Sequence, residues 1–365
     1  MKIKIYGYDL AEAVNKVAKA VATKSTTPVL EGIKIATDGD YAVFTATDMD
    51  IGIETRVKCE VVEQGETVVV GKAFVEYANK LTELDYVDLA SDGKQVKVKC
   101  GKIKFALSTM DGTAFPKIAT DLDGNGFVIS TEDLKRVVGA TTFCCATDEA
   151  RPILKGCLFE VVGETLNVCA LDGFRLALKT CEVKETDGSF KVVIPARSLA
   201  EIIRLLGDEN SVKIVLAKGT LSIKTANTIF TARLLNGDFV NYNALLSTPT
   251  FATVQVNKDE LLSALDRLSI IAKSKNNMVQ VQSQDDTLVM HSHSDLGNAK
   301  ETLAVKHDGV QVAVHCNYKF IADCLKAIDD ETVSICFGKG NSSPFFVCPT
   351  ANGDYKYLIL PMRNG

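Results

Sequence analysis

Asp121, Asp123, Asn125, Gly126 and Glu132 follow, at every defined position, the spacing of a calcium-binding loop, D-x-[DN]-x-[DN]-G-x5-E. Such a loop offers carboxylate and carbonyl oxygens to Ca²⁺, and its glycine permits a sharp turn between the ligands. Calcium binding is therefore the first chemistry that this sequence suggests.

The residues on either side of this loop argue against calcium binding. A calcium loop of this kind lies between two helices, whereas Phe115 and Pro116 stand where the first helix should be. Residues 127–129, Phe-Val-Ile, have the composition of a strand. We favour a linker whose Asp, Asn and Gly residues form turns, and calcium binding remains the alternative.

His291 and His293 are the second candidate, because residues two apart on a strand point to the same face. No third ligand follows at a spacing typical of a metal site, so we favour exposed or packed histidines. The chain also lacks a glycine-rich phosphate loop, a G-x-S-x-G motif and an H-E-x-x-H motif. No residue pattern supports an enzyme, and we expect neither a resident metal nor a cofactor.

The 11 cysteines are an odd number and include no C-x-x-C pair. Several alternate within expected strands, where cysteine acts as a small apolar residue: Cys157, Cys169, Cys336 and Cys348. We interpret the cysteines as reduced thiols of the core, the adjacent Cys144 and Cys145 included. With no apolar membrane span and no signal-peptide pattern, this usage predicts a cytoplasmic protein.

The elements that carry these residues repeat three times along the 365 residues. Each repeat opens with a short strand and then a helix whose apolar residues recur at i, i+3, i+4 and i+7, within 1–22, 127–147 and 252–272. Capping or acidic residues begin each helix. Strands with Asp/Gly turns follow, within 30–57, 154–183 and 278–305.

A second helix and a closing strand pair complete each repeat. We expect these helices at 73–84, 196–206 and 318–328. Matching apolar residues of the first helix, and of the second helix, recur about every 123 residues from one repeat to the next. Such a period is the signature of an internal repeat. The sequence therefore predicts an α+β fold of three repeated domains, at 1–120, 126–245 and 252–365.

Charge is distributed unevenly between the helices and the other elements. The chain carries a net charge of −5, whereas its six expected helices together carry +4 and the remaining residues −9. An acidic protein with relatively basic helices suggests that the helices face a polyanion. Solvated surface charge explains the same numbers, so we treat the pattern as supporting evidence only.

Four motifs carry a family resemblance that spans the whole chain. They are Thr27-Pro28-Val29-Leu30, Leu171-Asp172-Gly173-Phe174-Arg175-Leu176-Ala177, Leu235-Asn236-Gly237-Asp238-Phe239-Val240-Asn241-Tyr242 and Leu358-Ile359-Leu360-Pro361-Met362-Arg363. In this order and at this length, the chain resembles the bacterial β sliding clamp, the processivity subunit of the replicative DNA polymerase (DNA polymerase III beta subunit).

The resemblance implies the DNA clamp fold, in which each domain has two helices lining a pore and antiparallel sheets outside. Two protomers then close head to tail into a homodimeric ring around double-stranded DNA, holding its phosphates without reading sequence. Such a clamp tethers the polymerase catalytic subunit for processive DNA replication. Its other implied partners are the clamp loader and further proteins with a clamp-binding motif, and no membrane is involved.

The same resemblance implies site residues. DNA-facing candidates are Lys24, Lys72, Arg197 and Arg204. A pocket for partner peptides between the second and third domains is implied at Arg151, Leu154, Leu171, Gly173, Phe174, Arg175, Leu176, Val240, Leu245, Leu358, Ile359, Leu360, Pro361, Met362 and Arg363. Val240, Asn243 and Ala244 depart from the family's usual residues, so we expect the preference for partner motifs to differ.

Residues from both ends of the chain are implied at the ring interface. The apolar ones are Phe105, Leu107, Ile270 and Ile271, and Lys102 and Lys104 are expected to face Asp295 and Glu301. Pairing edge strands across this interface would remove exposed sheet edges. The alternative function is a monomeric, repeat-built protein- or calcium-binding module that does not encircle DNA.

Overall fold

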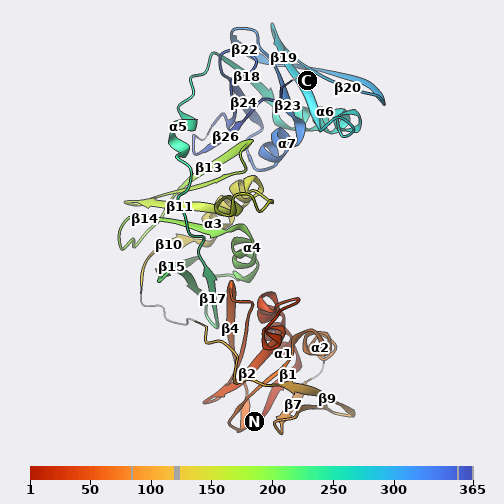
Figure 1. Ribbon diagram of the computed structural model, residues 1–365, viewed down its shortest axis with the longest axis vertical. Helices are drawn as coiled ribbons and strands as arrows, with labels where there is room; N and C mark the ends of the chain where they lie inside the picture. Colours follow the sequence, from red (N-terminus) through yellow and green to blue (C-terminus); the bar gives the residue numbers. More distant parts are fainter. Residues whose placement is uncertain (84, 119–123, 352, 364–365) are drawn as a thin grey trace. The chain divides into compact units, whose positions relative to one another are not determined.

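A computed structural model describes residues 1–83, 85–118, 124–351 and 353–363 (Figure 1). The chain divides into two compact units. The first comprises residues 1–131, 184–187 and 197–234, and the second comprises 132–183, 188–196 and 235–365. Each unit combines helices with antiparallel sheets, which agrees with the predicted α+β class.

Each repeat opens with a strand and a helix, as the sequence predicts: β1 (Lys2–Tyr6) with α1 (Gly7–Val17), β10 (Asn125–Ser130) with α3 (Thr131–Thr141), and β18 (Ala252–Asn257) with α6 (Lys258–Ala272). Leu10 and Val14 of α1 and Leu265 and Leu268 of α6 are fully buried, so the i, i+3, i+4 pattern marks the core face. Asn257 caps α6, because its Oδ1 accepts a hydrogen bond from the Glu260 N–H at 3.0 Å.

The second helices of the repeats are α2 (Gly71–Ala78), α4 (Ala196–Leu205) and α7 (Tyr318–Lys326). The prediction of 73–84 for the first of them was wrong at its end, because α2 stops at Ala78. The following Asn79 directs its side chain to Asn15 of α1, with an N–O distance of 2.6 Å, and asparagine and threonine are weak helix formers. Leu84 lies outside the described residues.

One 13-stranded antiparallel sheet makes up most of the first unit. Besides β1 and β10 it contains β2 (Gly32–Asp38), β3 (Tyr41–Thr47), β4 (Ile51–Lys58), β5 (Glu60–Glu63), β6 (Glu66–Val70), β7 (Tyr86–Ser91), β8 (Gln95–Cys100), β9 (Ile103–Met110), β15 (Ser211–Ala217), β16 (Thr220–Lys224) and β17 (Thr228–Arg233). Its order is β10-β15-β16-β17-β4-β3-β2-β6-β9-β8-β7-β1-β5. The pairing of β17 with β4 joins the second repeat to the first, and we call it the first joint.

Two sheets build the second unit. A nine-stranded sheet has the order β14-β11-β12-β13-β26-β25-β24-β18-β22, and a four-stranded sheet has the order β21-β20-β19-β23. Their strands besides β18 are β11 (Gly156–Val162), β12 (Thr165–Leu171), β13 (Arg175–Glu182), β14 (Phe190–Pro195), β19 (Met278–Gln284), β20 (Thr287–Ser294), β21 (Gly297–Ala304), β22 (Lys306–Gly309), β23 (Ala313–Asn317), β24 (Thr332–Phe337), β25 (Phe345–Pro349) and β26 (Tyr355–Ile359). The pairing of β13 with β26 joins the second and third repeats, and we call it the second joint. A short helix, α5 (Tyr242–Leu246), precedes β18.

The stretch with calcium-loop spacing contains a strand. Asp121 and Asp123 lie outside the described residues, whereas Asn125 and Gly126 belong to β10. A Cβ on Gly126 would lie only 2.0 Å from the Ile214 carbonyl oxygen, so close strand packing accounts for this glycine. The predicted strand at 127–129 is confirmed.

The two histidines of the sequence motif both lie on β20, where His291 is half-buried and His293 is exposed. In the described part of the chain, no three His, Cys, Asp or Glu residues are grouped closely enough to hold a metal ion. Over the same residues, no helix is long and apolar enough to cross a membrane.

All 11 cysteines are free thiols, and six of them are buried. Burial raises the pKa of Cys316 and Cys348 to about 12, so both remain protonated at neutral pH. Cys145 and Cys157 lie with their sulfur atoms 3.5 Å apart without a covalent bond. The prediction that cysteines serve the core is confirmed for the buried ones, and the other five are half-buried.

Candidate functional surfaces

A tight turn between β12 and β13 forms one wall of the candidate peptide pocket. Asp172 Oδ1 accepts hydrogen bonds from the backbone N–H groups of Phe174 at 2.8 Å and Arg175 at 3.0 Å. Gly173 has φ +96°, and a Cβ there would lie 2.4 Å from Arg151 Nη2. Both the backbone conformation and the neighbouring arginine therefore favour glycine at this position.

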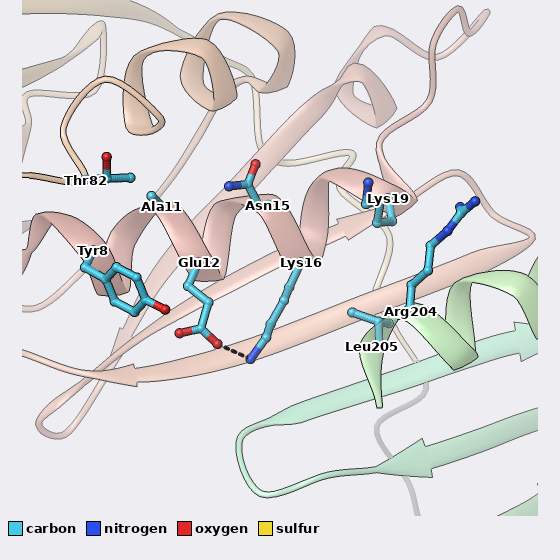
Figure 2. Close-up of a pocket in the computed structure, with 9 residues that line it drawn as sticks. All are labelled: Tyr8, Ala11, Glu12, Asn15, Lys16, Lys19, Thr82, Arg204 and Leu205. Carbon is cyan, nitrogen blue, oxygen red and sulfur yellow. Dashed lines mark ion pairs between the residues drawn. The ribbon is translucent and has the colours of Figure 1, made fainter. Parts of the chain in front are cut away.

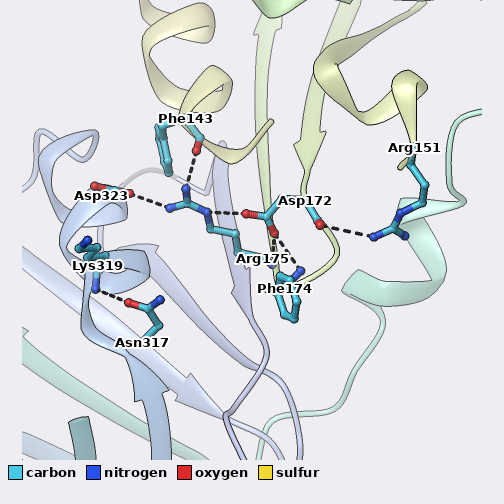
Figure 3. Close-up of polar contacts among 8 residues, drawn as sticks. All are labelled: Phe143, Arg151, Asp172, Phe174, Arg175, Asn317, Lys319 and Asp323. Carbon is cyan, nitrogen blue, oxygen red and sulfur yellow. Dashed lines mark hydrogen bonds and ion pairs between the residues drawn. The ribbon is translucent and has the colours of Figure 1, made fainter. Parts of the chain in front are cut away.

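Arg175 is held by three groups of its own unit (Figure 3). Its Nη1 donates to Asp323 Oδ2 at 2.7 Å, its Nη2 to the Phe143 carbonyl at 2.6 Å and its Nε to Asp172 Oδ2 at 3.1 Å. Burial disfavours the charged guanidinium, but the bonds to Asp323 and Asp172 outweigh it and raise the pKa of Arg175. Because only 12% of its side chain is exposed, Arg175 supports the pocket wall from within.

Five residues of the predicted pocket set are apolar and buried, and we call them the floor. Leu154, Leu171, Leu176 and Leu358 are buried together in one cluster, so the structure brings together residues that are far apart in the sequence. Ile359 is fully buried as well, in β26 at the second joint. These five residues serve the core.

Four apolar side chains of the predicted pocket set are exposed, and we call them the rim. Phe174 is 64% exposed, and Val240, Leu245 and Leu360 are each about two-fifths exposed at 38%, 40% and 37%. The Leu360 N–H donates to the Phe174 carbonyl at 2.9 Å, which fixes the chain after β26 beside the turn. Next along the chain, Pro361 and Met362 are half-buried and Arg363 is exposed.

Four positive residues of the first unit were predicted to face DNA. Lys24 and Lys72 are exposed, Lys72 being the second residue of α2. Arg197 is the second residue of α4 and pairs with Asp48, with 2.7 Å between Nη1 and Oδ2. Arg204 lies in the last turn of α4 and pairs with Glu201 at 2.5 Å. The two arginines are therefore partly neutralised within the chain.

A groove between α1 and the end of α4 adds two lysines that the prediction missed (Figure 2). Its volume is about 380 Å³, and Lys16, Lys19 and Arg204 all line it. Lys16 is paired with Glu12 at 2.7 Å, whereas Lys19 has no ion-pair partner among the described residues. Both lysines count in the positive charge of the first helix, but the family motifs do not mark them.

A second groove, of about 570 Å³, lies between α6 and α7 in the other unit. Lys273, Lys319 and Lys326 line it together with Asp266 and Asp323. The positive helix charge seen in the sequence is therefore concentrated in grooves between helix pairs.

The candidate ring-interface residues lie at two sheet edges. β9 pairs with β8 along its length, but it pairs with β6 only at Thr109 and Met110. Within the described residues, its other edge from Ile103 to Ser108 is unpaired. Phe105 stacks on Tyr77 with ring centroids 4.0 Å apart, and Leu107 is half-buried.

The corresponding edge of the second unit is β21, whose one neighbouring strand is β20. Glu301 on β21 forms a bidentate ion pair with Arg267 of α6, at 2.8 and 2.7 Å. On α6, Ile270 is 68% exposed and Ile271 is half-buried. Asp295, like Lys102 and Lys104 in the first unit, is exposed.

Comparison with known proteins connects these surfaces to one family. Profiles of the DNA polymerase III beta subunit match the chain as its N-terminal domain at 1–119, its central domain at 128–241 and its C-terminal domain at 245–363. A beta sliding clamp of Halalkalibacterium halodurans is 30% identical over 367 residues, covering 96% of both chains. The beta sliding clamp of Bacillus subtilis is 29% identical over the full length of both.

The chain belongs to the beta sliding clamp family. Solved structures agree: the sliding clamp of Bacillus subtilis matches with a TM-score of 0.95 at 30% identity, and the DNA polymerase III beta subunit of Pseudomonas aeruginosa with 0.94 at 27%, each over the full length of both chains. Sliding clamps of this family are non-catalytic processivity subunits of the replicative polymerase. The predicted fold of three clamp domains is confirmed, and the comparisons favour the clamp over a calcium-binding module.

Sequence reasoning did not name two aromatic residues that lie beside the candidate pocket residues. Phe239 and Tyr242 are buried in the same cluster as Leu154 and Leu358. The Tyr242 hydroxyl donates to the Glu160 carboxylate, and burial together with this bond raises the pKa of Tyr242. Both aromatics lie in the recognised motif at 235–242, but that motif alone does not distinguish floor residues from linker residues.

Proposed function

We propose that two copies of this chain close head to tail into a ring around duplex DNA in the cytoplasm. The ring tethers the polymerase catalytic subunit, the clamp loader and other partners that carry a clamp-binding motif. The observation that carries this proposal is that, within the described residues, β9 in the first unit and β21 in the second each have an edge without a pairing strand. Exposed edges of this kind are normally paired or covered.

In the proposed interface, the β9 edge of one copy pairs with the β21 edge of the other. Two apolar groups are available beside these edges: the Tyr77–Phe105 stack in one copy and the exposed Ile270 in the other. Burying a side chain of the size of Ile270 contributes about 1.5–3 kcal/mol. Glu301 already has Arg267 as a partner, so we assign Lys102 and Lys104 a smaller contribution.

Duplex DNA would be held by the lysines and arginines of the helix grooves. Lys16, Lys19 and Arg204 in the first unit and Lys273, Lys319 and Lys326 in the second place positive charge on helices. Contacts of this kind attract phosphates without regard to base sequence, which suits a protein that moves along DNA.

Partner proteins would dock through short peptides on the apolar pocket at the second joint. The exposed rim of Phe174, Val240, Leu245 and Leu360 gives an apolar side chain of the peptide a surface to cover. The buried floor residues pack beneath that surface and keep it in place.

The test is topological retention. The protein is loaded on nicked circular DNA with a clamp loader and ATP, isolated by gel filtration, and the DNA is then cut once. We expect the protein to stay on circular DNA and to leave within minutes of linearisation. Equal retention on both forms would contradict an encircling ring.

A further inference from the structure

The two joints of the chain contain the same turn. At the first joint, Asp48 Oδ1 accepts hydrogen bonds from the backbone N–H groups of Asp50 at 3.1 Å and Ile51 at 2.9 Å. This repeats the bonds of Asp172 at the second joint, and Met49, at the position of Gly173, also has positive φ, +78°. The two turns are therefore structural equivalents.

Strand register extends the equivalence to the strand that pairs beside each turn. Ile51 pairs with Ala232 at the first joint, as Arg175 pairs with Ile359 at the second. One residue further on, the Arg233 N–H donates to the Asp50 carbonyl at 2.8 Å, as the Leu360 N–H does to Phe174 at 2.9 Å. The first joint thus contains the counterpart of the peptide pocket proposed for the second.

The side chains at these equivalent positions differ in chemistry. The apolar rim residues Phe174 and Leu360 correspond to Asp50 and Arg233. The space beside Gly52 is filled by the chain itself, since a Cβ on Gly52 would lie 2.9 Å from Ile118. An apolar peptide anchor therefore finds no room at the first joint, and what remains open there is polar.

That opening is a cavity of about 260 Å³ at the first joint, which we call the joint cavity. Three cationic side chains line it, from Lys117, Lys218 and Arg233, and among the described residues Asp50 contributes the one carboxylate of the lining. All three are exposed, and in the described part of the chain none has a carboxylate within 4.0 Å. The cavity therefore has an excess of unpaired positive charge.

The backbone around these cations is fixed. Lys218 and Gly219 form the turn between β15 and β16 with φ values of +50° and +77°. The Gly219 carbonyl accepts the Leu234 N–H at 2.9 Å, which attaches this turn to the chain that leaves β17. Cations carried by an anchored turn and a strand end suit recognition of a carboxylate.

We propose that the joint cavity is a second docking site, which takes the carboxylates of an acidic peptide segment in a partner protein. An acidic peptide fits better than duplex DNA, because these cations lie on turns and a connector at strand ends, whereas the groove cations lie on helices. The inference goes beyond the proposed function, although its repeat argument rests on the peptide pocket proposed for the second joint.

The experiment measures binding of fluorescein-labelled hexaglutamate to the full-length protein by anisotropy at low salt. The variant Lys218→Asn/Arg233→Gln removes two cations, and asparagine tolerates the positive φ of residue 218. Lys99→Gln/Lys224→Gln, at two exposed lysines that do not line the cavity, removes the same charge and is the matched control. Thermal unfolding of each variant checks that the fold is retained.

We expect the double variant to bind hexaglutamate at least tenfold more weakly and the control to change less than twofold, with duplex DNA binding unchanged in both. Equal loss in the control, or no loss in the double variant, would overturn the proposal. Loss of duplex DNA binding without loss of peptide binding would assign the cavity to DNA instead. Because neither readout needs a closed ring, failure here is distinguishable from failure of the proposed function.

Discussion

The Asp48 carboxylate lies 2.7 Å from the guanidinium of Arg197, and only 11% of the Asp48 side chain is exposed. Asp48 thereby fastens the turn after β3 to the first residues of α4. The second joint uses the same kind of link with the charges exchanged, because there Arg175 next to the turn reaches Asp323 of α7 at 2.7 Å. In both cases an ion pair with one largely buried partner connects a turn of one repeat with the second helix of the next.

Changing Asp48 to Asn should increase the salt dependence of DNA binding. The amide oxygen can still accept from Asp50 and Ile51, whereas Arg197 loses its charged partner and becomes available to a phosphate. One added phosphate contact makes the slope of log K against log salt steeper by about 0.9. This slope is measured by the anisotropy of duplex DNA titrated with the protein at about 50 to 200 mM salt.

The matched control for this change is Asp40→Asn, in the exposed hairpin turn between β2 and β3. It alters the net charge equally but has no link to Arg197. A slope that changes as much in the control as in Asp48→Asn would attribute the effect to net charge alone.

Gly173→Ala should weaken partner-peptide binding by more than its effect on stability explains. The positive φ costs about 1–2 kcal/mol for a non-glycine residue, and the new Cβ forces Arg151 away from the turn. Gly163→Ala is the control, since Gly163 has φ +59° with open space around it. Denaturant unfolding measures the stability of both variants, and peptide titration measures their affinity for the partner peptide. We expect both variants to be destabilised to a similar extent. Only Gly173→Ala should lose peptide affinity, by about fivefold or more.

Ile270→Asp should dissociate the proposed dimer. A charge at a side chain that is 68% exposed in the single chain costs little in the monomer, whereas burying it in an interface is unfavourable. Val162→Asp on β11, which is 60% exposed, is the matched control. Sedimentation velocity at micromolar concentration should give a monomer for the first variant and a dimer for the second. If both variants are dimers, Ile270 does not belong to the interface.

Stability should fall as the pH decreases below neutrality, partly through His315. Burial, and secondarily the charge of Lys275, lowers the pKa of His315 below 6.5. The unfolded chain then takes up a proton more readily than the folded one, so stability present above pH 6.5 is lost as the pH falls through the folded pKa. The loss affects the segment that holds the C-terminal residues, because the His315 carbonyl accepts the Met362 N–H at 2.7 Å.

Melting temperatures at pH 7.5 and 5.5 test this expectation in His315→Gln and in His293→Gln, an exposed histidine of β20. The drop in melting temperature should be smaller in His315→Gln than in the unaltered protein, and unchanged in His293→Gln. An identical drop in all three proteins would show that another group dominates.

Local patterns in the sequence were sufficient for the repeat and for most helix boundaries. Leu10 and Val14 point into the core because a 3.6-residue period places them on one face, whatever the rest of the chain does. The end of α2 was misjudged, since the contact between Asn79 and Asn15 joins two helices that are far apart in the sequence. The loop at 121–132 satisfied a local motif, yet its second half pairs with β15 as a strand.

The sequence by itself determined the three repeats, the apolar faces of the helices and, through its motifs, the family. The tertiary structure decided which pocket residues line the floor and which form the rim, and how the charges are paired. Arg175 was predicted as a pocket residue, but its partner Asp323 is 148 positions away and neutralises it inside the unit. Lys179 is likewise buried against Asp354 at 2.5 Å, across the second joint. Such pairs depend on strand register and on desolvation, and neither is encoded in the spacing of neighbouring residues.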